Sequence, residues 1–111
     1  VHGNAQLLQQ VFTNLILNAC SAMSKGGVLV LATWATTATW VEIRFHDTGH
    51  GIPPELLPRI FDPFFTTRPA GMGVGLGLAV SHSIIRQHQG TIEVQSEVGK
   101  GTTFTIGLPT I

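Results

Sequence analysis

A chain of 111 residues with 43% hydrophobic side chains can bury a core, and we expect residues 1–111 to form one domain excised from a longer protein. Six Lys and Arg balance six Asp and Glu, which argues against nucleic-acid binding because no basic surplus exists to neutralise phosphates. No apolar run approaches the ~20 residues of a membrane span, and a single cysteine excludes an internal disulfide and fits a reducing compartment. We therefore expect a cytoplasmic domain that makes no membrane contact of its own.

The pattern of apolar, Gly and Pro residues predicts, in chain order, a helix, two strands, a short helical stretch, a Gly-rich loop, a second helix and two more strands. The corresponding ranges are 4–23, 28–36, 39–47, 52–60, 66–75, 77–89, 91–96 and 102–108. Gly26 and Gly90 are expected to end the two long helices, since glycine is the usual residue after a helix. Helices and strands that interleave in this way indicate an α/β layer fold with the helices on one face of the sheet.

Asp47 ends a strand in which Ile43 and Phe45 share its parity, so its carboxylate is expected on the apolar face. A carboxylate there is costly without a dedicated partner, and it could accept a hydrogen bond from an exocyclic amine such as that of adenine. Gly49 and Gly51 follow in the same turn and would let a ligand approach the backbone. The alternative is an Asp that caps the turn with its own backbone, and this motif by itself does not decide between the two.

Asn14 and Asn18 are four residues apart and therefore share one face of the first helix, next to the apolar residues Val11 and Leu15. Amide oxygens can help to coordinate Mg²⁺, which also keeps water and substrate phosphates in its shell. The alternative is a pair of solvent-facing amides without a ligand. Their apolar neighbours indicate that the pair borders the core. Cys20 on the same helix is expected to be a buried thiol.

Gly71, Gly73, Gly75 and Gly77 alternate immediately before the second helix. Glycine leaves backbone N–H groups accessible and a helix N-terminus favours anions, so the arrangement favours a phosphate site over a loop without a ligand. It is not a Rossmann fingerprint, because Leu78 occupies the place of the third glycine.

An aromatic run at 60–65 precedes this loop, and Arg68 follows it. Phe61 is expected to pack on the core as a hydrophobic plug. Arg68 either reaches a phosphate or lies in solvent, and the sequence leaves both readings open.

Together and in this order, the motifs resemble the catalytic, ATP-binding domain of bacterial two-component sensor histidine kinases, over nearly the whole chain. The segments that resemble the N, G1, F and G2 boxes and the closing Gly-Thr element of that family are 14–19, 47–52, 60–65, 73–78 and 99–104. The run 64–67 is most similar to the branch that contains nitrogen-regulation and dicarboxylate-sensing kinases. The resemblance implies the Bergerat fold of the GHKL ATPases, a two-layer α/β sandwich whose mixed, mostly antiparallel sheet is covered on one face by about three helices.

The resemblance also implies a site for ATP and Mg²⁺. Asn18 would hold Mg²⁺, Asp47 would accept a hydrogen bond from the adenine amine, and Thr102 would help to hold a water beside it. The nucleotide-binding residues implied in this way are Asn14, Asn18, Asp47, Gly49, Gly51, Ile52, Gly73, Val74, Gly75, Leu76, Gly77, Leu78 and Thr102. Asn14 and Arg68 are expected to take part in phosphoryl transfer. Because Asn cannot serve as the base that activates water, transfer to a protein is favoured over hydrolysis.

The implied function is transfer of the γ-phosphoryl group of ATP to a His on a separate dimerisation domain, which passes it to a response regulator. The phosphoacceptor His of the family, which an acidic residue follows on a helix, has no counterpart here, so this chain alone is expected to bind nucleotide without phosphorylating itself. We expect the chain to be monomeric and its parent kinase dimeric. Two alternatives on the same fold remain, a non-catalytic nucleotide-binding or partner-docking module and an anti-sigma-type serine kinase.

Overall fold

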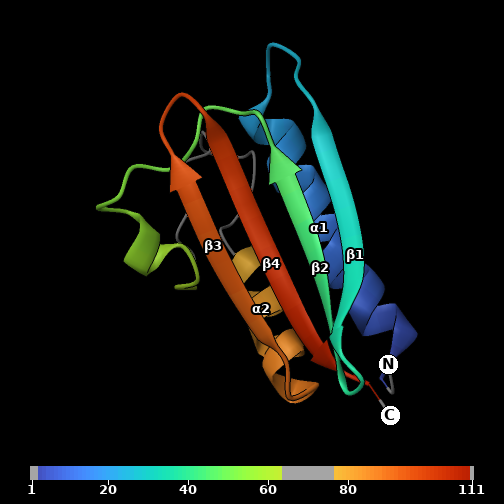
Figure 1. Cartoon of the computed structure of the whole chain (residues 1–111). Coiled ribbons are helices and arrows are strands. Elements are labelled where there is room, and N and C mark those ends of the chain that lie inside the picture. The colour runs from blue at the N-terminus through green and yellow to red at the C-terminus, as the bar shows by residue number, and fades with distance from the viewer. Residues whose placement is uncertain (1–2, 64–76, 111) are drawn as a thin grey trace.

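The computed structural model describes residues 3–63 and 77–110. The described elements are, in chain order, α1 (Ala5–Ala22), β1 (Leu29–Thr37), β2 (Trp40–Asp47), the 3₁₀ turn η1 (Leu57–Arg59), α2 (Gly77–Gln87), β3 (Thr91–Glu97) and β4 (Gly101–Pro109). The strands form one sheet in the order β1-β2-β4-β3, and every neighbouring pair is antiparallel (Figure 1).

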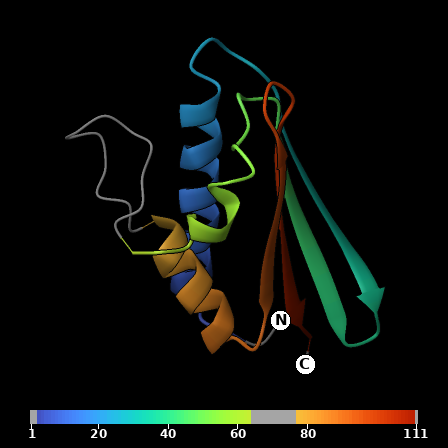
Figure 2. The same cartoon turned by 90° about the vertical axis from the view of Figure 1, so that its left-hand side faces the viewer.

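Both α-helices lie on the same face of this sheet, which makes a two-layer α/β sandwich (Figure 2). The α/β fold and the one-sided helical layer are therefore confirmed. The described sheet is antiparallel throughout rather than mixed, and the expected third helix is reduced to η1. Pro53, Pro54 and Pro58 lack the backbone N–H groups that a longer helix in this segment would need.

α1 begins after Asn4, whose side-chain Oδ1 accepts a hydrogen bond from the backbone N–H of Leu7 at 3.0 Å. Val11, Leu15 and Ala19 recur every four residues and are buried on one face of the helix. Cys20 is exposed, contrary to the expectation of a buried thiol, because it lies one residue beyond Ala19 and so points about 100° away from the buried face.

The end of α2 also differs from its expected form. The left-handed backbone conformation after the helix is adopted by Gln89, with φ 56°, and not by Gly90. Gly90 instead permits close packing, since a Cβ there would overlap the carbonyl oxygen of Gly107 on β4. The glycine after α2 is therefore required for close packing against β4 and not, as predicted, for ending the helix.

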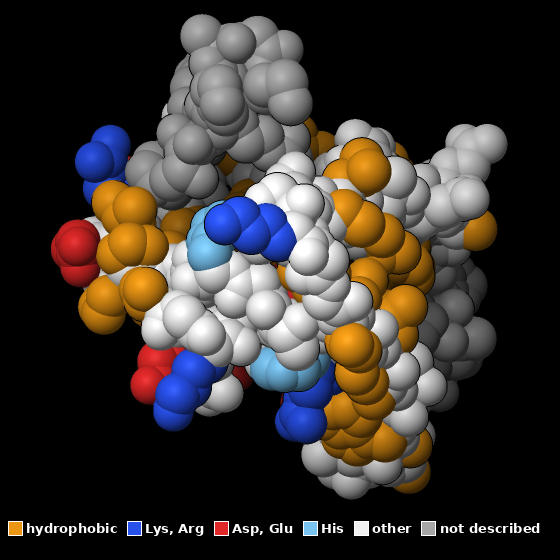
Figure 3. Space-filling model, turned by 90° about the horizontal axis from the view of Figure 1, so that it is seen from above, with side chains coloured by type: hydrophobic (Ala, Val, Ile, Leu, Met, Phe, Trp, Pro, Cys, Tyr) orange, Lys and Arg blue, Asp and Glu red, His pale blue; other side chains and the backbone are white. Residues whose placement is uncertain are grey.

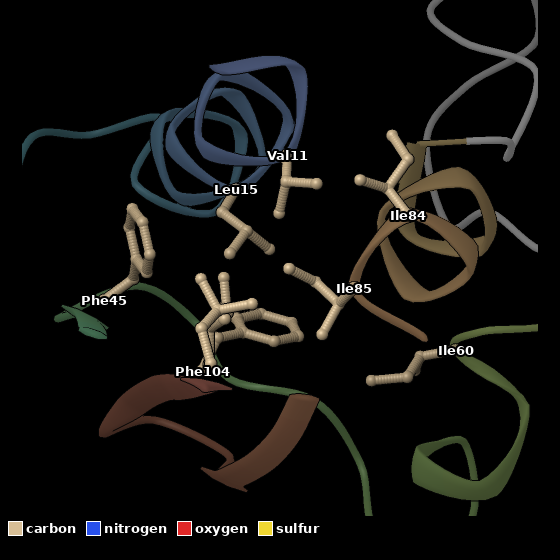
Figure 4. Packing of buried hydrophobic residues seen from close by; sticks show 9 residues of the cluster. Val11, Leu15, Phe45, Ile60, Ile84, Ile85 and Phe104 are labelled. Carbon is tan, nitrogen blue, oxygen red and sulfur yellow. The ribbon is translucent and has the colours of Figure 1, made fainter. Parts of the chain in front are cut away.

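The helix-facing side of the sheet is built from rows of register partners on β2, β4 and β3. Three consecutive rows are Ile43–Ile106–Ile92, Phe45–Phe104–Val94 and Asp47–Thr102–Ser96. The first two rows are apolar and face Val11 and Leu15 of α1 and Ile84 and Ile85 of α2 (Figure 4). The third row continues the same face into a polar end, where β2 stops and β4 starts.

Candidate functional site

We call Asp47, Thr102 and Ser96 the polar row. Asp47 and Thr102 are both 4% exposed, so a carboxylate and a hydroxyl lie side by side at the end of an otherwise apolar face. The parity argument that put Asp47 on this face is confirmed. Burying polar groups is costly unless they are hydrogen-bonded. Because the row carries this cost at the end of an apolar face, we treat it as a candidate functional site.

One oxygen of the Asp47 carboxylate has a partner within its own turn. Oδ1 accepts a hydrogen bond from the backbone N–H of Gly49 at 2.8 Å, which is the turn-capping role that the sequence left open. A carboxylate can accept about four hydrogen bonds through its two oxygens. Capping the turn therefore does not prevent Asp47 from also accepting a hydrogen bond from a ligand.

The loop that follows Asp47, residues 48–52, is fixed by hydrogen bonds to four other segments of the chain. These bonds are Thr48 N to Val28 O at 3.2 Å, His50 N to Ala22 O at 3.1 Å, Gly99 N to His50 O at 2.9 Å and Ile52 N to Ser96 Oγ at 2.7 Å. The end of α1, the residue before β1, strand β3 and the β3–β4 turn hold the loop together. Its backbone is thus positioned before any ligand arrives, which lowers the ordering cost of binding.

Gly49 and Gly51 lie against the protein itself. A Cβ at Gly49 would lie 2.6 Å from the carbonyl oxygen of Ala22, and one at Gly51 would overlap the carbonyl oxygen of Glu97. Gly51 also has φ +78°, which side chains rarely adopt. The two glycines therefore allow the loop to pack closely against the end of α1 and the end of β3. This packing fixes the position of the backbone that they are predicted to present to a ligand.

Asn14 links the two helices. Its Nδ2 donates to the carbonyl oxygen of Gly77 and to the hydroxyl of Ser81, both at 3.3 Å. Gly77 is the first residue of α2, so Asn14 lies beside a helix N-terminus, where the backbone favours anions. Leu78, next in α2, packs against the hydrophobic core, as Ile52 does at the other end of the site.

One face of α1 connects the N-terminus of α2 with the loop. Asn14, Asn18 and Ala22 are spaced by four residues, with Asn14 bonded to Gly77 and the carbonyl oxygen of Ala22 bonded to His50. At 1.5 Å per residue, this face spans roughly 12 Å along the helix. Asn14 and Asn18 are both half-buried, so the expectation that they border the core is confirmed.

Several residues expected in the site lie outside the described ranges. They are Arg68, Gly73, Val74, Gly75 and Leu76, together with the aromatic residues Phe64 and Phe65. Phe61 is described and packs on His82 of α2, with ring centroids 5.1 Å apart, which agrees with its expected role as a plug.

Sequence reasoning missed two hydroxyl groups. Ser81, with 0% exposure, bonds Asn14, and Ser96 bonds Thr102 and Ile52. A signal for Ser96 was present, because it shares parity with the apolar Ile92 and Val94 in β3. Its partners could be identified only once the register of β3 and β4 was known.

Figure 3 views the molecule from the end of the sheet at which the polar row lies. Neutral polar side chains and backbone atoms, together with Lys or Arg and His side chains, occupy the middle of the described surface, and hydrophobic side chains lie on two sides of it. Lys100 and Glu97 form an ion pair at 3.4 Å in the β3–β4 turn, and both side chains are exposed. An exposed pair of this kind adds little stability, about 0–1 kcal/mol.

The model of the family described as histidine kinase-, DNA gyrase B-, and HSP90-like ATPase matches residues 3–111. The chain belongs to this ATPase family. The signal transduction histidine-protein kinase AtoS of Escherichia coli K12 is 44% identical over 109 residues, which are 98% of this chain and 18% of AtoS. The mycobacterial sensor histidine kinase MprB superposes with a TM-score of 0.88 at 28% identity, over 98% of this chain and 76% of the solved chain. Full-length ShkA, solved in complex with AMPPNP, gives 0.82 at 31% identity, over 93% of this chain and 21% of ShkA.

The resemblance to the catalytic domain of sensor histidine kinases, in the nitrogen-regulation-like branch, is confirmed by these relatives. As an ATPase domain of this family, the chain is an ATP-binding domain. It spans only about a fifth of the length of AtoS. In the part of the chain that the structure describes, neither helix combines the length and apolar character needed to cross a membrane.

Proposed function

We propose that this domain binds Mg-ATP with the adenine at the polar row and the phosphates toward the N-terminus of α2, and that it phosphorylates a His on a separate dimerisation domain. The observation that carries the proposal is the buried pair of Asp47 and Thr102 at one end of the roughly 12 Å helix face that starts beside Gly77. An acceptor pair suits an amine at one end, and a helix N-terminus suits phosphate at the other.

In the proposed reaction an imidazole nitrogen of the acceptor His attacks the γ-phosphorus, the bond to the β–γ bridging oxygen breaks, and ADP leaves. Transfer of this kind depends mainly on positioning and on neutralisation of charge. Asn18 would hold Mg²⁺ through its amide oxygen, and the cation would offset the charge of the phosphates. Asn14 and Arg68 would take part on the phosphate side, as would the glycines of 73–77.

The partners that follow from this proposal are the dimerisation domain of the parent kinase and then a response regulator. The resemblance to a signal transduction kinase such as AtoS supports this choice over the alternatives of a non-catalytic module and a serine kinase. The chain itself would be monomeric, and its parent dimeric.

Asn18→Ala is expected to remove most of the tightening of ATP binding that Mg²⁺ produces, because the mutant lacks the amide oxygen proposed as the metal ligand. The measurement is a titration of ATP by calorimetry with and without Mg²⁺. Gln10→Ala is the matched control, since Gln10 is an exposed amide on the same helix. A mutant that responds to Mg²⁺ as strongly as the wild type would show that Asn18 is not a ligand.

With Mg-ATP alone, the chain is expected to show no acid-labile phosphorylation and at most feeble hydrolysis. A dimerisation domain from the parent kinase, added separately, should become phosphorylated on His, slowly because the two parts are not tethered. Radiolabelled ATP with acid and alkali treatment of the product tests this, since phospho-His is acid-labile and phospho-Ser is not. Acid-stable phosphate on the added domain would favour the serine kinase, and phosphate on a His of the chain itself would contradict the proposal.

A further inference from the structure

Ser81, near the start of α2, is a buried side chain that has no part in the reaction proposed above. Its exposure is 0%, so it cannot contact a nucleotide directly. Its Oγ lies 3.3 Å from Nδ2 of Asn14, and the carbonyl oxygen of Gly77 lies at the same distance from that nitrogen. Both partners belong to the first five residues of α2, so the beginning of this helix holds one side-chain amide of α1.

The chemistry of the two partners decides which way the Asn14 amide is turned. The carbonyl oxygen of Gly77 can only accept a hydrogen bond, so the group beside it must be the NH₂ and not the amide oxygen. The NH₂ carries two hydrogens, and the hydroxyl oxygen of Ser81 accepts the second. The amide oxygen is on the other branch of the side chain and therefore faces away from these two groups.

The amide oxygen of Asn14 is available to a ligand. It has no hydrogen-bond partner among the described residues, and none of their buried side-chain polar atoms lacks a partner, so this oxygen must be accessible. It cannot bond to a phosphate oxygen, because both are acceptors, but it can accept from a water in the shell of Mg²⁺. This acceptor therefore fits the cation proposed for Asn18, which lies four residues along the same face of α1.

We propose that Ser81 is a positioning residue that fixes Asn14 so that the amide oxygen, and not the NH₂, is presented to the nucleotide site. The inference rests on the proposed function, in which Mg-ATP binds along the face of α1 that carries Asn14. The bond to Gly77 is made by the backbone, so Ser81 supplies the side-chain half of the restraint. Without its hydroxyl, one bond remains and the amide can turn about its last torsion, which is intrinsically broad. The contribution of Asn14 to binding the hydrated cation then falls, whereas nucleotide contacts made without metal do not change.

The test measures the Kd of ATP by calorimetry with and without Mg²⁺, and the ratio of the two values gives the tightening that Mg²⁺ produces. Ser81→Ala is expected to lower this ratio about fivefold, the effect of one neutral hydrogen bond, and to leave the metal-free Kd unchanged. In the Asn14→Ala background, Ser81→Ala should lower the ratio no further. Ser83→Ala, the same substitution at an exposed position of α2, should leave the ratio unchanged.

A serine that only supports the packing of α2 would give a different result. Ser81→Ala would then weaken ATP binding by the same factor with and without Mg²⁺, and such an unchanged ratio overturns the inference, as does a further loss in the Asn14→Ala background. If Ser81→Ala does not fold, Ser81→Cys answers the same question, because a thiol of similar size is a weaker acceptor and should lower the ratio partially. A wild type that does not bind ATP, or whose ATP binding does not respond to Mg²⁺, would overturn the proposed function itself. A wild type that responds beside a mutant with the same ratio would overturn only the role of Ser81.

Discussion

Asp47→Asn is expected to weaken ADP binding by roughly ten- to a hundredfold while leaving the fold intact. Asn keeps an Oδ1 that can accept from the N–H of Gly49, so the turn after β2 is preserved. The substitution removes the negative charge and replaces an acceptor with an NH₂ donor, which would face the donor hydrogens of the adenine amine. Losing a charge-assisted hydrogen bond costs about 1.5–3 kcal/mol, which gives the expected change in Kd.

Calorimetry with ADP measures this change, and circular dichroism verifies the fold. Asp62→Asn is the matched control, because Asp62 is exposed and has no place in the polar row. An Asp47→Asn variant that binds ADP as tightly as the wild type would show that Asp47 serves only to cap its turn.

Gly101→Ala is expected to lower the free energy of unfolding by about 3 kcal/mol, the upper end of the cost of a strained backbone. Gly101 has φ +131°, and a Cβ there would overlap the carbonyl oxygen of Asp47 on the paired strand. That oxygen belongs to the backbone and cannot move aside without disturbing the pairing of β2 with β4. Urea denaturation measures the loss.

Gly99→Ala separates the cost of the positive-φ backbone from the cost of the steric overlap with Asp47. Gly99 also has a left-handed backbone, with φ +82°, but a Cβ there would meet nothing within 4 Å. Its substitution should therefore cost only about 1 kcal/mol, from the backbone conformation alone. Equal losses for the two variants would mean that the close approach of β4 to Asp47 has no energetic consequence.

Short-range patterns in the sequence were sufficient to predict the two α-helices, the four strands and the burial of Asp47. Parity along a strand places Asp47 with Phe45, and a four-residue spacing places Asn14 with Asn18, without any knowledge of tertiary contacts. Both expectations depend only on the period of the secondary structure, which explains why they succeeded.

Contacts between distant segments could not be predicted in this way. The bonds of Asn14 to Ser81 and of Ser96 to Ile52 join residues that are 67 and 44 positions apart. They depend on how the helices pack and on the register of the strands. The close packing of Gly49 against Ala22 likewise depends on where α1 ends relative to the loop. The sequence alone therefore does not reveal that the protein's own backbone also requires glycine at 49.

The face of α1 that carries Asn14, Asn18 and Ala22 sets the length of the proposed site. One end of this face is bonded to Gly77 and the other to His50. The number of residues between 14 and 22 therefore sets the distance between the proposed phosphate and adenine ends of the site. Inserting or deleting one residue between 14 and 22 would turn one end by about 100° against the other and shift it by about 1.5 Å. The length of this stretch is therefore fixed, and only its exposed positions, such as Leu17, can vary in composition.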